Sequence, residues 1–240
     1  MKKSLEVLSS KEALIAKALT IVTQRIEAAV QERGGCAIAL AGGSTPKPLY
    51  AALSQQNLPW SKIHIFWGDE RYVDPDNLQS NQKMAVEAWL NQVDFPKANI
   101  HPIPTAAENP VLDASAYEEE LQRAFGTEQP RFDLILLGIG SDGHTASLFP
   151  HTEALKVGDR LVTVGNKDGE PRITFTVPLI NNARSVIFLV AGADKRQALD
   201  QILAPTADAM TYPARLVQPH AGELLMLLDE AAGAEIAVAS

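Results

Sequence analysis

Short runs of consecutive apolar residues, separated by segments with helical spacing, constrain the fold of this chain more than any other feature. Apolar runs of this length are typical of strands buried on both faces. They lie at residues 36–41, 63–67, 132–137, 161–164, 173–177, 186–191 and 224–228. Helical patterns lie between many of them, at residues 46–53, 81–90, 114–125 and 195–203. This alternation predicts an α/β fold with a mainly parallel, Rossmann-like open sheet flanked by helices on both faces.

The first apolar pattern predicts that the chain opens with a helix, before the strand at 36–41. Apolar residues recur on one helical face at Ile15, Leu19, Val22, Ile26 and Val30. Ser9 and Glu12 form a capping box before this face, and Gly34 and Gly35 supply the positive φ that commonly ends a helix. The apolar residues after Leu228 suggest a final helix.

Composition narrows the classes of partner. The chain has 21 basic against 29 acidic residues, a net charge of −8, and no clustered basic stretch, so nucleic acid is not an expected partner. Charged residues interrupt the N-terminal apolar runs before they reach signal-peptide or membrane-spanning length, which predicts a cytoplasmic protein with no membrane partner. Without a repeat or a linker, residues 1–240 are expected to form a single α/β domain, and a monomer is the default expectation.

A glycine turn follows the first predicted strand, with the sequence Gly42-Gly43-Ser44-Thr45-Pro46. In open α/β sheets ligands collect beyond the carboxyl ends of the strands. Exposed amides and hydroxyls before a helix form a cradle for an anion, so the turn predicts a phosphate site, although the same pattern suits an ordinary tight turn. The turn lacks the Gly-Lys-Ser/Thr ending of a Walker A loop, which disfavours nucleotide hydrolysis.

Charged residues follow the next strand, at Asp69, Glu70 and Arg71. Asp69 can orient a sugar hydroxyl or tune a proton, and Arg71 can hold an anionic or polarised oxygen. A solvated cluster of surface charges is the alternative reading.

The strand at 132–137 runs into a glycine-rich turn that contains Asp142 and His144. Gly138, Gly140 and Gly143 formally match GxGxxG, but Pro150 cuts short the helix that a dinucleotide site requires, so NAD binding is disfavoured. Histidine can accept a proton from water near neutral pH. We therefore expect His144 to act as a general base with Asp142 beside it.

Two later basic residues complete the candidate site. Arg172 lies beside the strand at 173–177, and Lys195 follows the strand at 186–191 near a helix start. With the first glycine turn they could form a phosphate pocket, in which Arg172 binds through two nitrogens and Lys195 acts as a point charge. His, Cys and acidic residues show no metal-ligand spacing, so no metal is predicted, and the single Cys36 is read as core packing.

These segments together resemble the 6-phosphogluconolactonase family. Residues 41–46, 68–71, 138–150 and 172–174 carry the resemblance, and the Asp-Gly-His-Thr-Ala-Ser-Leu-Phe-Pro element at 142–150 is highly specific. The related glucosamine-6-phosphate deaminases look similar, but they carry glutamate where this chain has Phe149 and tyrosine where it has Arg71. The resemblance implies hydrolysis of 6-phospho-D-glucono-1,5-lactone in the oxidative pentose phosphate pathway, without a cofactor.

A site can be drawn from the residues and the resemblance together. The substrate phosphate would lie on Gly43, Ser44, Thr45, Arg172 and Lys195. His144 would deprotonate water, Asp142 would fix the imidazole, Arg71 would stabilise charge on substrate oxygens, and Asp69 would orient the sugar or hold Arg71.

Three alternatives stay open. An acyl-enzyme could form on Ser141 or Ser147, although no GxSxG elbow is present. The chain could be a sugar-phosphate isomerase or deaminase, or a sensor that binds a sugar phosphate without turnover.

Overall fold

Two sheets carry the fold, and the computed structural model describes residues 2–234 and 236. The large sheet has the strand order β1-β10-β9-β6-β2-β3-β5 with parallel pairing throughout, and the small sheet has the order β4-β8-β7 with antiparallel pairing. The strands are β1 (Lys2–Leu8), β2 (Cys36–Leu40), β3 (Ile63–Trp67), β4 (Asp69–Arg71), β5 (Ile100–His101), β6 (Leu134–Leu137), β7 (Val162–Lys167), β8 (Glu170–Phe175), β9 (Ser185–Val190) and β10 (Glu223–Asp229). The predicted α/β class with a mainly parallel sheet is confirmed.

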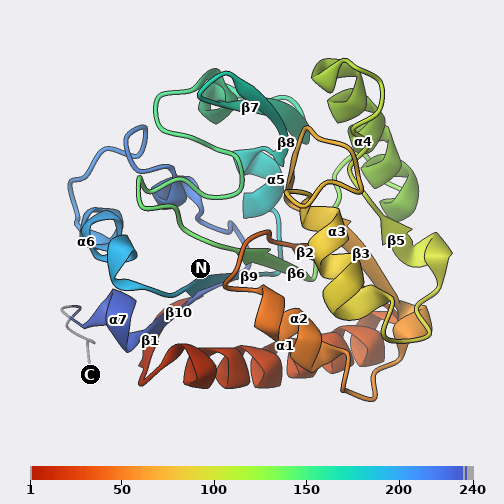
Figure 1. The fold of residues 1–240 in the computed structure, drawn as a ribbon, viewed down its shortest axis with the longest axis horizontal. Helices are drawn as coiled ribbons and strands as arrows, with labels where there is room; N and C mark the ends of the chain where they lie inside the picture. Colours follow the sequence, from red (N-terminus) through yellow and green to blue (C-terminus); the bar gives the residue numbers. More distant parts are fainter. Residues whose placement is uncertain (1, 235, 237–240) are drawn as a thin grey trace.

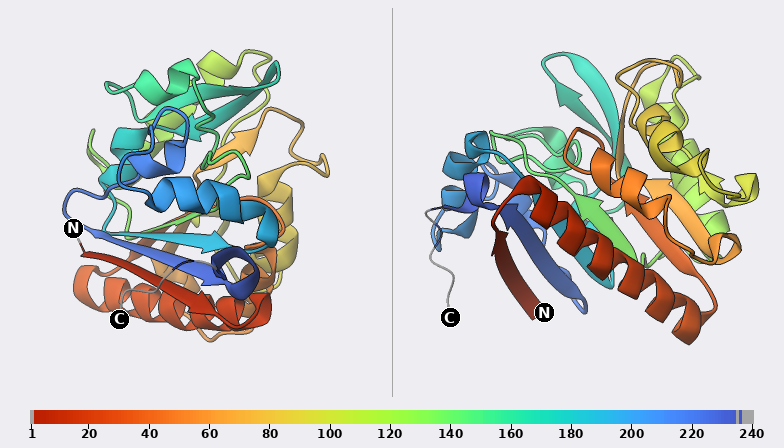
Figure 2. Two further views of the ribbon diagram at one scale, coloured as in Figure 1. Left: turned by 90° about the vertical axis from the view of Figure 1, so that its left-hand side faces the viewer. Right: turned by 60° about the horizontal axis from the view of Figure 1, so that its bottom comes forward.

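Helices cover the large sheet on both faces (Figure 1). They are α1 (Lys11–Arg33), α2 (Lys47–Leu53), α3 (Asn81–Ala85), α4 (Pro110–Phe125), α5 (Val177–Asn181), α6 (Arg196–Leu203) and α7 (Glu230–Gly233). The left view of Figure 2 shows α1 beneath β1, β10 and β9 and α6 above them. Among the described residues, no helix has the length and apolar content needed to cross a bilayer.

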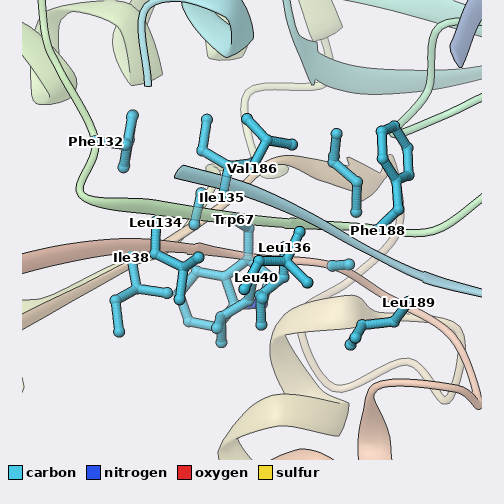
Figure 3. Packing of buried hydrophobic residues seen from close by; sticks show 14 of the residues in the cluster. Ile38, Leu40, Trp67, Phe132, Leu134, Ile135, Leu136, Val186, Phe188 and Leu189 are labelled. Atoms are coloured by element: carbon cyan, nitrogen blue, oxygen red, sulfur yellow. The ribbon is translucent and has the colours of Figure 1, made fainter. Parts of the chain in front are cut away.

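The apolar strands are buried because the helices shield both faces of the sheet. Figure 3 shows Val186 and Phe188 on one face of β9, with Leu134 and Leu136 of β6 and Leu189 of β9 on the other. These side chains are at most 2% exposed. Successive residues of a strand alternate between faces, so continuous apolar runs fit a sheet covered on both sides.

The chain opens with a strand, so the prediction that it opens with a helix is wrong. β1 lies at the edge of the large sheet and pairs only with β10, and its first residues are exposed. An edge strand with one covered face tolerates Lys2 and Lys3, which is why it lacks the continuous apolar signal. The helix cap is Ser10, whose Oγ accepts from Ala13 N at 3.2 Å, and not Ser9.

The predicted strands at 161–164 and 173–177 exist, but they belong to the small antiparallel sheet. Asp168 and Gly169 join β7 to β8 in a tight turn, both with positive φ. A two-residue turn can connect only antiparallel neighbours, because a parallel pair needs a long crossover. Of the suggested C-terminal helix, the structure has the single turn α7, and residues 235 and 237–240 lie outside the described residues.

Candidate active site

A cavity of about 390 Å³ lies where the carboxyl ends of β2, β6 and β9 face the small sheet. The residues predicted from the sequence meet there: its lining includes Gly42, Gly43, Ser44, Thr45, Asp69, Arg71, His144, Arg172 and Lys195. Of the predicted site residues only Asp142 does not line the cavity, and it contacts His144 instead. The carboxyl edge of the large sheet therefore positions the site.

The glycine turn at 42–46 has a close contact that excludes a side chain. A Cβ on Gly42 would lie 1.9 Å from Asn81 Oδ1, and Gly43 has φ of +95°. The start of the turn is fixed by Tyr50, whose hydroxyl donates to Ala41 O at 2.7 Å and accepts from Ala41 N at 3.0 Å. Gly43 and Ser44 are exposed to the cavity, which suits contact with an anion.

Asn81 is a lining residue that the sequence did not reveal. Its side chain is buried and donates from Nδ2 to Asp69 O at 3.0 Å while it contacts Gly42. Asn81 begins α3 directly after its capping residue Ser80. In the sequence, Asn81 reads as an ordinary residue at a helix start. Only its tertiary contact with Gly42 distinguishes it as a residue of the cavity.

The turn after β6 presents the His144 imidazole to the cavity. Gly140 N donates to His144 O at 2.8 Å, and His144 N donates to Asp142 Oδ1 at 3.1 Å. His144 Nδ1 lies 2.5 Å from the same Asp142 oxygen. Because Asp142 accepts the Nδ1 proton, Nε2 is left as the ring nitrogen with a free lone pair.

Asp142 is held ionised by this pair. Burial alone would raise the pKa of Asp142, but hydrogen bonds from the His144 ring and backbone outweigh burial and lower that pKa to about 2. The Asp142 carboxylate is therefore negative throughout the neutral range.

The Asp142 carboxylate is expected to stabilise the fold in a pH-dependent way. A lowered pKa in the folded state means that this stabilisation is present above the ordinary value of 3.8 and is lost as the pH falls toward about 2. The side chain is 46% exposed, so we expect less than about 1 kcal/mol. Urea unfolding of wild type and Asp142→Asn should differ at pH 6 and converge toward pH 2; a constant difference would contradict the assignment.

Gly140 is required by the same turn. A Cβ at Gly140 would lie 2.1 Å from His144 Nδ1 and 2.5 Å from Asp142 Oδ1. Gly140→Ala is therefore expected to displace the imidazole and lower kcat/KM by about 10²-fold, because misplacing a reacting group by 1 Å has effects of that size. Steady-state kinetics and circular dichroism measure this, with Gly158→Ala as a control, since a Cβ at Gly158 meets nothing within 4 Å. Unchanged kinetics in the Gly140 variant would contradict it.

The two neighbouring acids after β3 have different surroundings. Asp69 lines the cavity, and its Oδ2 accepts from Ser147 Oγ at 2.6 Å. Glu70 accepts from Asn81 N at 2.8 Å and Gln82 N at 2.7 Å at the start of α3. Alternate residues of β4 point to opposite sides, so Asp69 belongs to the cavity and Glu70 to the helix start.

Neither serine of the acyl-enzyme alternative lines the cavity. Ser147 is fully buried, donates its hydroxyl to Asp69, and donates its backbone N–H to Thr174 Oγ1 at 3.2 Å. Ser141 lies on the exposed part of the turn. The surroundings of Ser147 suit a structural link between the His144 turn and the small sheet.

Three cationic side chains converge on the cavity. Arg71 and Arg172 are directly opposite each other in the β4–β8 ladder, and Lys195 Nζ lies 2.9 Å from Asp194 Oδ2. Burial, and then the Arg71 charge, lower the pKa of Arg172. Among the described residues, the buried Nε atoms of Arg71 and Arg172 have no hydrogen-bond acceptor. Arg71 also donates from Nη1 to Gln79 O at 2.6 Å, so two guanidiniums with positive charge lie opposite each other at the cavity.

In residues 2–234 and 236, no group of three or more His, Cys, Asp or Glu side chains is arranged to hold a metal ion.

Comparison with known proteins connects this site to a family. Residues 9–226 match the sequence profile described as "Glucosamine-6-phosphate isomerases/6-phosphogluconolactonase". The 6-phosphogluconolactonase of Synechocystis sp. is 64% identical, covering 97% of this chain and 98% of the relative, and that of Nostoc sp. is 59% identical, covering 99% and 100%. The solved 6-phosphogluconolactonase of Trypanosoma cruzi superposes with a TM-score of 0.89 at 32% identity, covering 98% of this chain and 97% of the other.

Proposed function

The chain belongs to the family of glucosamine-6-phosphate isomerases and 6-phosphogluconolactonases, and from that premise we propose that it hydrolyses 6-phospho-D-glucono-1,5-lactone with water activated by His144. It is a lactone hydrolase of the 6-phosphogluconolactonase type, as its similarity to two relatives of that name indicates. The product is 6-phospho-D-gluconate, and the reaction belongs to the oxidative pentose phosphate pathway.

One observation carries the mechanism: His144, whose Nδ1 is paired with Asp142, lines a cavity together with three cationic side chains. Hydrolysis of a phosphorylated lactone needs a base for water and positive groups for the phosphate. This arrangement supplies both within one cavity.

His144 is the general base in the proposed reaction. Nε2 accepts a proton from water as the water oxygen attacks lactone C1, and Asp142 stabilises the imidazolium that forms. Arg71 stabilises the negative charge on the carbonyl oxygen. When the bond from C1 to the ring oxygen breaks, the imidazolium returns its proton to that oxygen, so the acid and a free hydroxyl result.

The substrate is held by its phosphate. The turn formed by Gly42, Gly43, Ser44 and Thr45 offers backbone and hydroxyl donors, while Arg172 and Lys195, which line the same cavity, offer positive charge. Asp69, with one oxygen held by Ser147, orients a sugar hydroxyl with the other. These contacts would place C1 near His144.

Lactone disappearance is the test of this proposal. The lactone is generated freshly by glucose-6-phosphate dehydrogenase, spontaneous hydrolysis is subtracted, and the assay is repeated with chelator. Fast hydrolysis that resists chelation supports the proposal. Ammonia release from glucosamine 6-phosphate without lactone turnover would indicate a deaminase, and 6-phosphogluconate binding without any turnover would indicate a sensor.

We propose that the enzyme acts in the cytoplasm as a monomer, with residues 1–240 as a single domain. The pairing of β1 with β10, which joins the two ends of the described chain in one sheet, supports the single domain. Sedimentation at micromolar concentration measures the oligomeric state.

A further inference from the structure

Phe149 lies behind the cavity, in contact with two of the groups that face it. Its ring is 4% exposed, and its centroid lies 4.5 Å from that of the His144 imidazole, with the rings tilted by 43°. The Arg172 guanidinium carbon lies 5.5 Å from the same centroid. One aromatic ring therefore contacts the proposed base and a proposed phosphate ligand that comes from the other sheet.

The backbone around Phe149 fixes the place of the ring. Thr152 donates to Phe149 O through its backbone N–H at 3.3 Å and through Oγ1 at 2.8 Å. Leu148 N donates to Thr145 O at 3.0 Å, which closes the preceding turn. These hydrogen bonds hold the backbone at Phe149 and before it, and the ring itself is packed, since the residue is 4% exposed.

The physical chemistry of the ring suits both neighbours. The face of an aromatic ring attracts cations within about 6 Å. Arg172 carries a permanent charge and is opposed by Arg71, so a contact that favours its position offsets part of that repulsion. His144 becomes a cation when it deprotonates water, and the ring favours that form over the neutral one.

We propose that Phe149 is a positioning residue for the lactonase reaction: it sets the separation of His144 and Arg172 and stabilises His144 in its protonated form. This inference rests on the proposed function, because it assigns a role to Phe149 in the same site. It adds a residue that does not line the cavity and therefore acts through the side chains that its ring contacts.

Phe149→Leu tests the proposal, because leucine keeps much of the apolar volume but has no aromatic face. We expect kcat/KM to fall about tenfold, with a lower kcat and a higher KM, because both the base and the phosphate ligand are affected. Phe149→Tyr keeps the aromatic face and should remain within about threefold of wild type. Phe188→Leu is the matched control, since Phe188 is 1% exposed in the core and contacts neither group.

A pH readout separates this role from a purely structural one. Among the described residues, the charged groups in contact with the Phe149 ring or the His144 imidazole include Asp142 on the same turn, Arg172 on β8 and Lys167 on β7. Asp69, Arg71, Asp194 and Lys195 line the same cavity, and Phe149→Leu substitutes none of these charged residues. The acidic limb of kcat/KM should move to lower pH in Phe149→Leu and not in Phe188→Leu. Nuclear magnetic resonance of the His144 imidazole, which requires no turnover, should show proton uptake at lower pH.

The outcomes are distinct. Wild type without lactone turnover would overturn the proposed function, while the imidazole titration would still decide whether Phe149 stabilises the protonated histidine. An active wild type whose Phe149→Leu variant keeps its kinetics and its titration would overturn the role of Phe149. Equal losses in Phe149→Leu and Phe149→Tyr, or in Phe149→Leu and Phe188→Leu, would also overturn it, since neither result would depend on the aromatic face at this site.

Discussion

His144→Ala should lower kcat/KM for the lactone by about 10³-fold, the largest effect expected for any single change in this site. Removal of a general base typically reduces the rate by about 10² to 10⁴. His144 lines the cavity, and its Nδ1 is engaged by Asp142 at 2.5 Å, which leaves Nε2 as the nitrogen that can accept a proton. The measurement is the initial rate of lactone loss above spontaneous hydrolysis at neutral pH, with KM expected to change little.

His220→Ala is the control for this change, because His220 is an exposed histidine outside the cavity. It should keep the wild-type rate. Retention of most activity by His144→Ala would remove the histidine from the mechanism. Loss of wild-type activity on chelation, restored by added metal, would show that water is activated by an ion and not by the imidazole alone.

Arg172→Ala is expected to raise KM by about 10²-fold and to change kcat much less. A charge-assisted hydrogen bond to phosphate contributes about 1.5–3 kcal/mol, and Arg172 can form two such bonds through its planar guanidinium. If Arg172 binds the phosphate, which takes no part in bond breaking, its removal weakens binding of the ground state and of the transition state equally. The lost binding free energy then appears as a higher KM. Arg172→Lys should recover part of the affinity, because lysine keeps the charge without the planar fork.

The control for Arg172 is Arg123→Ala, which removes an arginine that is 73% exposed and pairs with Glu120 on α4. It should leave KM unchanged. A fall in kcat at constant KM in Arg172→Ala would place Arg172 at the reacting carbonyl and would contradict phosphate binding. Titration of 6-phosphogluconate by calorimetry gives the same comparison without turnover.

The sequence predicted the large sheet because its central strands are apolar on both faces. Residues 132–137 and 186–191 reach the centre of the sheet as β6 and β9, flanked by helices. β1 carries no such signal, since an edge strand has fewer buried positions. The two-residue β5 is too short to give a period of two.

The site was predictable where it depended on strand ends, and not where it depended on packing between distant segments. His144 and the glycine turn follow strands directly, so their meeting at one edge followed from parallel topology. The contact of Asn81 with Gly42, and that of Arg172 with the ring of Phe149, depend on side-chain directions that no local pattern encodes. The different surroundings of Asp69 and Glu70 required the pairing of β4 with β8.

The pairing of β1 with β10 has a consequence for synthesis of the chain. Lys2 is in register with Glu223, so β1 pairs with a strand that is translated more than 200 residues later. β10 lies between β1 and β9, so β1 joins the rest of the large sheet only through this late strand. Until residues 223–229 emerge, β1 has no partner and α1 lacks part of the surface that it covers. Folding of the large sheet is therefore expected to finish only after translation of β10, and until then the side of β9 that pairs with β10 stays an unpaired sheet edge.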